Sequence, residues 1–149
     1  MKALIQRVSS ASVRVEGKIV GDIGTGLLLF IGVGREDDQP KADALLSKVL
    51  AYRIFAETDK DGKVRMNCSL ADTGGGLLIV SQFTLVAETH KGLRPGFSSA
   101  ASPADAEALY NYFVEQACAR HPVVASGVFA ADMQVALVND GPVTFLLEN

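Results

Sequence analysis

"GGGLLIVSQFTLV", residues 74–86, is the stretch that decides the fold, because it joins a long apolar run to a short polar cluster. The apolar part is typical of a strand that is buried on both faces of a sheet. Ser81, Gln82 and Thr84 then follow within four positions, with only Phe83 between them. A buried polar group costs free energy unless it has a hydrogen-bonding partner. These side chains are therefore either satisfied within the chain or face a ligand.

The place of this cluster in the strand favours a site. If the strand continues through it, side chains alternate, so Gln82 and Thr84 share one face while Ser81 and Phe83 share the other. In sheets packed with helices, ligands often bind just beyond the carboxyl ends of strands. A plainer interpretation stays open, because threonine favours strands and its hydroxyl can bond to the backbone.

The segments before this stretch also have clear periods. Alternating apolar and polar residues over 3–24 predict antiparallel strands, and the apolar run 26–34 predicts another buried strand. Over 35–55 the period becomes helical, with Asp37 and Asp38 as candidate caps. We expect the apolar face of this helix at Ala42, Leu45, Leu46 and Val49.

The segments after it predict a loop, a helix and two strands. Gly, Pro and Ser content indicates a loop over 88–103, in which Ser102 caps a second helix that begins at Pro103. The apolar face of that helix is expected at Leu109, Tyr112, Phe113 and Ala117. Two final strands, over 127–138 and 143–148, flank "NDGP", which is a turn by composition.

Length and composition limit the class of protein. The 149 residues fit a single domain over residues 1–149, which we expect to be a strand-rich α/β domain with two main helices. The net charge of −3 argues against a general nucleic-acid binder, although a local basic patch stays open. A hydrophobic content of 48% favours a homodimer. Two cysteines, no leader-like segment and no long apolar run predict a cytoplasmic protein without membrane contact.

Several common chemistries have no motif here. The sequence has neither a G-x-S-x-G elbow nor a P-loop, and in "IGVGRED" Asp37 replaces the third glycine of a dinucleotide fingerprint. His90 and His121 lack ligand spacing with each other or with the cysteines, so we expect no metal site. A hydroxyl–histidine esterase that uses His90 stays open, although no spacing supports it.

Two motifs together point to a known family. "SQFTL" at 81–85 and "NDGPVTF" at 139–145 resemble the D-aminoacyl-tRNA deacylases. The resemblance runs the whole length, through "ALIQRVSSASVRVEG", "YRIFAE", "KGLRPGFSSAASP" and "FAADMQVALVNDGPVTF". It implies a barrel-like arrangement of mixed and antiparallel sheets, and a homodimer with active sites at its interface. The implied reaction, without metal or organic cofactor, is hydrolysis of the ester that joins a D-amino acid, or mischarged glycine, to tRNA.

The resemblance also assigns residues. It implies that Gly141-Pro142 is a cis dipeptide that reaches into the neighbouring subunit, where its carbonyls hold the substrate α-amino group and its main chain excludes an L side chain. Arg7 resembles the arginine that braces this dipeptide, although by itself it could equally be a surface strand residue. Lys91 and Arg94 are candidates for contact with tRNA phosphates, or two solvated loop cations.

We expect the catalytic residues to be Ser81, Gln82, Phe83 and Thr84, with Ser81 and Gln82 positioning the ester or the ribose. A Thr84 nucleophile needs an adjacent base, and "SQFTL" contains neither histidine nor carboxylate. We therefore favour a water activated with help from the 2′-hydroxyl of the terminal ribose, an oxyanion held by backbone N–H groups near Phe83 and Thr84, and a Phe83 ring that packs the pocket. A sibling deacylase for a small L-amino acid and a non-catalytic tRNA-end-binding module stay open.

Overall fold

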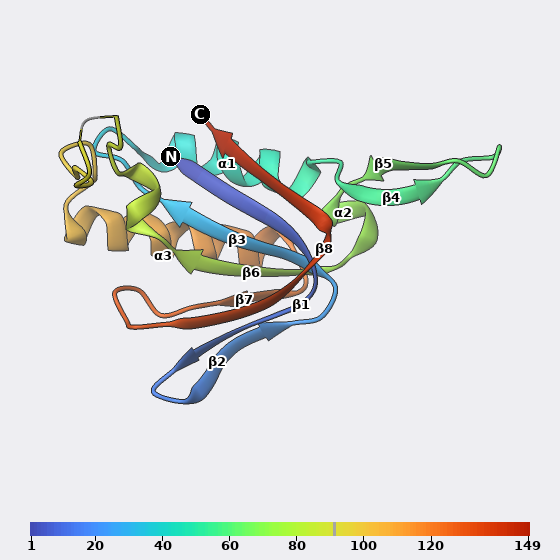
Figure 1. Cartoon of the computed structure of the whole chain (residues 1–149), viewed down its shortest axis with the longest axis horizontal. Helices are drawn as coiled ribbons and strands as arrows, with labels where there is room; N and C mark the ends of the chain where they lie inside the picture. The colour runs from blue at the N-terminus through green and yellow to red at the C-terminus, as the bar shows by residue number, and fades with distance from the viewer. Residues whose placement is uncertain (91) are drawn as a thin grey trace.

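The structure, a computed structural model, describes residues 1–90 and 92–149. It is an α/β fold in which a strongly curved sheet curls beside two long helices, so that the expected mixed, barrel-like architecture is confirmed (Figure 1). The helices are α1 (Gln39–Ala51) and α3 (Pro103–Arg120), and they contact each other. The six strands of the sheet are β1 (Lys2–Val15), β2 (Lys18–Ile23), β3 (Gly26–Gly32), β6 (Gly76–Ser81), β7 (Val124–Ser126) and β8 (Gln134–Glu148).

The curl of the sheet is centred on β1. One edge of this strand pairs first with β3, over Lys2–Val8, and then with β2, over Ala11–Val15. The other edge pairs with β8 along nearly its whole length. Next to β3 come β6 and then β7, both in parallel pairs, so the sheet is mixed. Both ends of the chain lie together at one side of the sheet (Figure 1).

The apolar runs are buried on both sides because the sheet covers two cores. Side chains of Leu27, Leu29 and Ile79 face one core, together with α1 and α3. The intervening Leu28 and Leu78 face a second core, which is closed by the far half of β1, by β2 and by β8 rather than by a helix. This arrangement explains why β3 and β6 are continuously apolar instead of alternating.

Both long helices begin where the sequence predicts. The Asp38 side chain accepts a hydrogen bond from the N–H of Lys41 at the start of α1, and Ser102 caps α3 in the same way, ahead of Pro103. The four expected core residues of α1 are all buried. On α3 one expectation was wrong, because Tyr110 is buried whereas Tyr112 is half-buried and bonds to Asp43 on α1.

Sequence periodicity missed the region between α1 and β6. Strands β4 (Phe55–Thr58) and β5 (Val64–Cys68) form a separate hairpin that projects from the body of the molecule, and a short helix α2 (Leu70–Thr73) follows it (Figure 1). Most of this hairpin is exposed, so it carries no clear burial pattern for the sequence to record. No helix in residues 1–90 and 92–149 is long and apolar enough to cross a membrane.

The C-terminal expectation also needs correction. Residues 127–133 are not a strand, and "NDGP" is not a hairpin turn between two strands. A single strand, β8, runs through it along the same edge of β1. The turn-like composition belongs to a bulge within one strand, and composition alone does not separate a bulge from a reversal of the chain.

Candidate active site

The strand that decides the fold ends inside the "SQFTL" motif. β6 stops at Ser81, and Phe83–Val86 form a short 3₁₀ helix, η1. The last tie to the sheet is the bond from the N–H of Gln82 to the carbonyl of Ile31, 2.8 Å, after which Leu85 N–H donates to the Gln82 carbonyl. The expected alternation of side chains through Thr84 was therefore wrong. Thr84 and Phe83 are exposed, so these polar groups are not buried in a strand.

The helix η1 lies directly on β3 because Gly32 has no side chain. A Cβ at Gly32 would approach the Leu85 Cβ to 2.9 Å and the Gln82 carbonyl oxygen to 3.2 Å. Such contacts are too close to be accommodated without movement of the main chain. Gly32 thus allows the polar end of β6 to turn sharply beside the sheet, where it forms one wall of a cavity.

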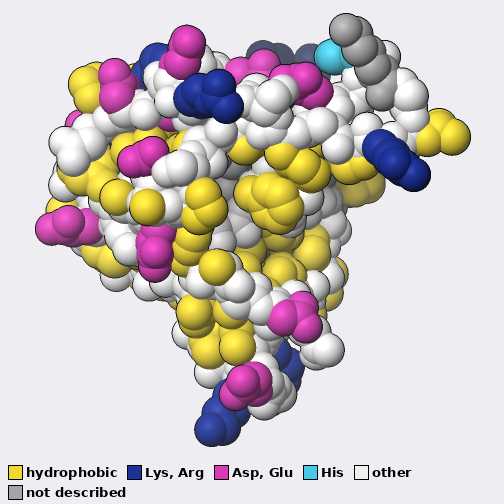
Figure 2. Space-filling view, turned by 90° about the vertical axis from the view of Figure 1, so that its left-hand side faces the viewer, with side chains coloured by type: hydrophobic (Ala, Val, Ile, Leu, Met, Phe, Trp, Pro, Cys, Tyr) yellow, Lys and Arg dark blue, Asp and Glu magenta, His cyan; other side chains and the backbone are white. Residues whose placement is uncertain are grey.

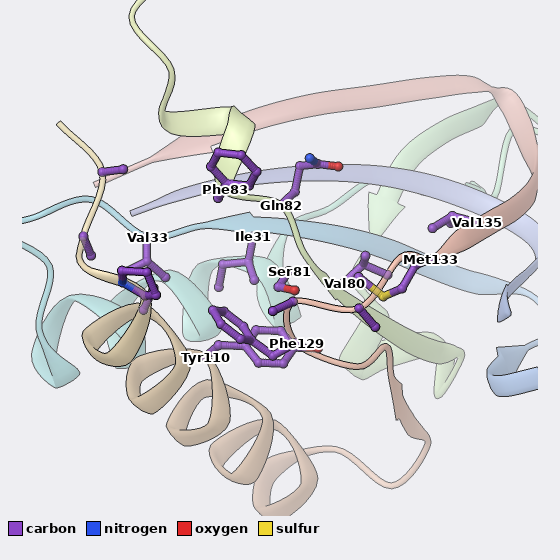
Figure 3. Close-up of a pocket in the computed structure, with 16 residues that line it drawn as sticks. Ile31, Val33, Val80, Ser81, Gln82, Phe83, Tyr110, Phe129, Met133 and Val135 are labelled. Atoms are coloured by element: carbon purple, nitrogen blue, oxygen red, sulfur yellow. The ribbon is translucent and has the colours of Figure 1, made fainter. Parts of the chain in front are cut away.

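A cavity of about 550 Å³ opens at this end of β6, on the face where apolar side chains gather around a hollow (Figures 2 and 3). Ser81, Gln82 and Phe83 contribute polar and aromatic groups to its wall. Most of the remaining lining is apolar and comes from β3, α3 and the segment that leads into β8. Its principal members are Ile31, Val33, Ala106, Tyr110, Phe129 and Met133. Its size and mostly apolar wall are those of a small-molecule site.

Unpaired backbone donors belong to Phe83, which lines the cavity, and to Thr84, which directly follows it. Within the described chain, the backbone N–H groups of Phe83 and Thr84 have no acceptor, as is usual for the first residues of a helix. The amide of Gln82 donates to the Thr84 hydroxyl at 2.5 Å. No carboxylate or histidine pairs with the hydroxyl of Ser81 or Thr84 among these residues, so neither has a base beside it.

Tyr110 connects two segments of the cavity wall through its hydroxyl group. Its hydroxyl lies 3.1 Å from the Ile79 carbonyl on β6 and 3.4 Å from the Gly127 carbonyl at the start of the segment that carries Phe129. Burial raises the pKa of Tyr110 to about 12, so the hydroxyl stays protonated at neutral pH and remains a donor. It therefore joins two separate parts of the cavity wall (Figure 3).

The second motif forms a bulge in β8. Gln6 pairs with Thr144 and Val8 pairs with Asn139, so residues 140–143 stand out from the strand. Asn139 closes the neck of the bulge, because its side-chain oxygen accepts from Val143 N–H at 2.8 Å and its amide donates to the Thr144 hydroxyl at 2.9 Å. Gly141 and Pro142 at the tip are exposed, and the bond between them is cis.

Arg7 lies between the two paired positions and holds the bulge. Its Nε donates to the Asp140 carbonyl at 3.0 Å and lies 3.2 Å from the Asp140 carboxylate. Its Nη1 donates to the carbonyl of Ile54 at 2.6 Å. The planar guanidinium therefore ties the bulge to the segment before β4, which a surface strand residue would not do.

The structure brings together only part of the predicted site. Ser81, Gln82 and Phe83 line the cavity, whereas Thr84, Gly141 and Pro142 do not. Arg94 is exposed on the 88–103 loop, and Lys91 lies outside the described residues.

His90 does not join this site, because it lines a second cavity with Glu88, Ser98 and Lys41. His121 caps α3 and is buried, with Nε2 2.6 Å from the Gly75 carbonyl, so a surface position for it is excluded. In residues 1–90 and 92–149, no group of three His, Cys, Asp or Glu side chains is arranged to hold a metal ion.

Sequence reasoning did not find Asn139, Tyr110, Phe129 or Met133. Asn139 and Thr144 stand on either side of the Gly-Pro dipeptide and bond to each other across the neck of the bulge. Their positions in the sequence are a local signal for a closed bulge. Tyr110 looks like any other apolar helix residue, and Phe129 and Met133 lie in a segment without a regular period. These residues join the site only through the fold.

Comparisons with known proteins agree with this geometry. The profile of the family described as D-Tyr-tRNA(Tyr) deacylase matches residues 4–148. The chain is 63% identical over 149 residues to the D-aminoacyl-tRNA deacylase of Stutzerimonas stutzeri, with 100% of both chains covered. It is 59% identical over 148 residues to that of Cellvibrio japonicus, with 99% of both covered.

Solved structures show the same fold. A structure titled "c-Myc DNA Unwinding Element Binding Protein" has a TM-score of 0.92 and 40% identity, and the match covers 100% of this chain and 99% of that one. A second, titled as a probable eukaryotic D-amino acid tRNA deacylase, has a TM-score of 0.81 at 19% identity over 98% and 97% of the two chains, and shows the fold alone. With the match over residues 4–148 and these close full-length relatives, the chain belongs to the D-Tyr-tRNA(Tyr) deacylase family.

Proposed function

We propose that this protein is a D-aminoacyl-tRNA deacylase, a hydrolase that releases the amino acid from the 3′ end of tRNA. One observation carries the proposal beyond family membership. The polar end of β6 places Ser81 and Gln82 in the wall of a largely apolar cavity, beside the unpaired N–H groups of Phe83 and Thr84. A carbonyl compound bound there can accept hydrogen bonds from these groups. None of them is a charged base.

The cavity suits the aminoacylated terminal nucleoside. Its volume of about 550 Å³ lies in the usual range for small-ligand sites, and its apolar wall suits the flat face of a base. Ser81 and Gln82 are the groups that position the ester or the ribose. Backbone N–H groups of Phe83 and Thr84 stabilise the developing oxyanion, and one such donor is typically worth ~10²–10³ in rate.

The attacking group is a water molecule in this proposal. Neither Ser81 nor Thr84 has a base within hydrogen-bonding reach among the described residues, and an unactivated hydroxyl is a weak nucleophile. An aminoacyl ester is already activated, so less help is required. The 2′-hydroxyl of the terminal ribose helps to activate the water, which attacks the ester carbonyl carbon. The bond from that carbon to the 3′-oxygen then breaks, and the 3′-oxygen takes up the proton that the water loses.

A second copy of the chain completes the site. Gly141 and Pro142 are exposed at the tip of the β8 bulge and do not line the cavity of their own chain. We propose a homodimer in which this dipeptide enters the partner's cavity, holds the α-amino group by its carbonyls, and occupies the space of an L side chain. Glycine has no side chain to exclude, so glycyl-tRNA is also a substrate on this account.

The 88–103 loop is proposed to contact the rest of the tRNA. Arg94 is exposed there, and Lys91 is proposed as its companion. The overall charge of −3 suits a protein that grips only the acceptor end and not a long duplex.

Substitution of Thr84 by alanine tests the attacking group. We expect Thr84→Ala to keep most of the activity on D-tyrosyl-tRNA, within about five-fold of the wild type, because the backbone N–H groups remain and only one exposed hydroxyl is lost. Single-turnover rates measure the effect. Complete loss of hydrolysis with the fold and tRNA binding intact contradicts it and assigns the threonine as nucleophile. His90→Ala serves as control and should leave the rate unchanged, since His90 lines the other cavity.

The reaction itself is tested by adding purified protein and a chelator to D-tyrosyl-tRNA. We expect release of free D-tyrosine and intact tRNA. Binding of the charged tRNA without release contradicts the proposal and supports a tRNA-end-binding module instead.

A further inference from the structure

Two phenylalanines form an exposed aromatic pair at the cavity. The rings of Phe83 and Phe97 have centroids 4.9 Å apart and are tilted by 42°. Phe83 is 62% exposed and Phe97 is 38% exposed, so the pair is open to solvent on one side. Of the two, Phe83 lines the cavity, and Phe97 packs beside the Phe83 ring. The expectation that Phe83 simply packs the pocket does not account for this exposure.

Bonds on both sides of Phe97 hold its main chain in place. Before it, Glu88 and Gly96 exchange backbone hydrogen bonds of 2.8 and 3.0 Å. After it, the Ser98 hydroxyl donates to the Glu88 carboxylate at 2.7 Å, and the Ser99 hydroxyl donates to the Val86 carbonyl at 2.9 Å. These bonds link this segment to Val86, the last residue of η1, and to Glu88, which follows it. The pair is therefore built into the fold and is not a chance contact of a loose loop.

We propose that the Phe83–Phe97 pair is a stacking platform for the unpaired base that precedes the terminal adenosine of tRNA. The inference rests on the proposed function, because that function places the terminal nucleoside in the cavity. The 3′ end of tRNA is single-stranded, and unpaired bases stack on aromatic side chains with little dependence on their identity. Since Phe83 borders the cavity, the pair lies next to the place where this function puts the terminal nucleoside.

The loop that carries Phe97 also carries an exposed cation. Arg94 is exposed three residues before Phe97 and offers a cation to a backbone phosphate. The carboxylate of Glu88, the nearest acid on this loop, is bonded to Ser98. An aromatic platform with a neighbouring cation is the usual arrangement for single-stranded nucleic acid, whereas a subunit contact is usually a wider apolar surface.

The test compares two substrates, both of which carry the terminal adenosine and only one of which carries the nucleotides before it. One is D-tyrosyl-tRNA and the other is the 3′-D-tyrosyl ester of adenosine, which lacks those nucleotides. For Phe97→Leu, which keeps apolar bulk but removes the ring, we expect the ratio of kcat/KM for tRNA to kcat/KM for the adenosine ester to fall about ten-fold, mainly through KM. Phe97→Tyr restores a ring and should keep the ratio within about two-fold of the wild type.

A matched control lies on the other side of the molecule. Val64 is 69% exposed on the β4–β5 hairpin, so Val64→Ala removes exposed apolar surface far from the pair and should leave the ratio unchanged (Figure 1). An equal fall on both substrates overturns the inference, because Phe97 then only supports the shape of the cavity. An unchanged ratio for Phe97→Leu overturns it too.

Two further results, dissociation of the variant into monomers and lack of activity in the wild-type protein, would each overturn the inference. Dissociation of Phe97→Leu into monomers, measured by light scattering, assigns the pair to a contact between copies of this chain. If the wild-type protein releases D-tyrosine from neither substrate, the proposed function fails and the platform fails with it. Release from both substrates by the wild type, without the expected change in ratio, rejects the platform alone.

Discussion

Gly141→Ala is expected to lower the rate of D-tyrosine release from D-tyrosyl-tRNA by about 100-fold, the scale of a 1 Å misplacement at a reacting centre. Gly141 has a φ of +137°, a conformation that is almost restricted to glycine. An alanine Cβ would approach Val143 Cγ2 to 2.7 Å and Arg7 Nη2 to 3.0 Å. The bulge must therefore move, and with it the Gly141-Pro142 dipeptide that is proposed to exclude L side chains. Single-turnover kinetics measure the change.

Gly62→Ala is the matched control for this substitution. Gly62 also has a left-handed conformation, with φ of +77°, but nothing lies within 4 Å of a Cβ there, and it belongs to the turn of the β4–β5 hairpin. Gly62→Ala should lose about 1–2 kcal/mol of stability from its backbone conformation, and Gly141→Ala should lose more because of its two close contacts. Only Gly141→Ala should lose activity. Equal activities for the two folded variants would contradict a role for the bulge in catalysis or binding.

Arg7→Ala is expected to reduce deacylation by about ten- to 100-fold, because the guanidinium fixes the position of the bulge. The substitution removes the bonds to the Asp140 and Ile54 carbonyls and leaves both carbonyls without their partner. We also expect the free energy of unfolding to fall by ~1–3 kcal/mol, as for other charged hydrogen bonds. Activity and thermal unfolding are measured on the same preparation.

Asp140→Asn separates the position of the bulge from its charge. The Asp140 side chain is 57% exposed, so its ion pair with Arg7 contributes little, and the main-chain carbonyl that Arg7 contacts remains. We expect activity within about three-fold of the wild type, on the scale of a weak surface ion pair. Full activity for Arg7→Ala would contradict the bracing role, as would equal losses for the two variants.

Periodicity was sufficient for the parts of the fold where burial repeats along the chain. The strands before residue 33, the cap of α1 at Asp38 and the cap of α3 at Ser102 follow from local pattern. Periodicity failed where the regular pattern of burial along a strand is interrupted. β6 stops at Ser81 because Gly32 lets η1 fold against β3, and that contact joins residues 50 positions apart. No local property of "SQFTL" records it.

The two motifs of the candidate site could be identified from the sequence, but the cavity could not. The resemblance named Arg7 and Gly141-Pro142, and Arg7 on β1 bonds to the bulge of β8 that carries the dipeptide and is closed by Asn139. The cavity, in contrast, needs Tyr110 to join β6 to the segment around Phe129, across more than one element of the fold. Such contacts are long-range and leave no periodic trace in the sequence.

The account rests on chiral discrimination by a deacylase, and one measurement tests it most directly. One tRNA is charged with D-tyrosine and, separately, with L-tyrosine, and release of each amino acid by purified protein is followed with a chelator present. The account predicts rapid release of D-tyrosine and almost none of L-tyrosine. Release of both at similar rates would contradict it, because the Gly141-Pro142 dipeptide would then not exclude an L side chain.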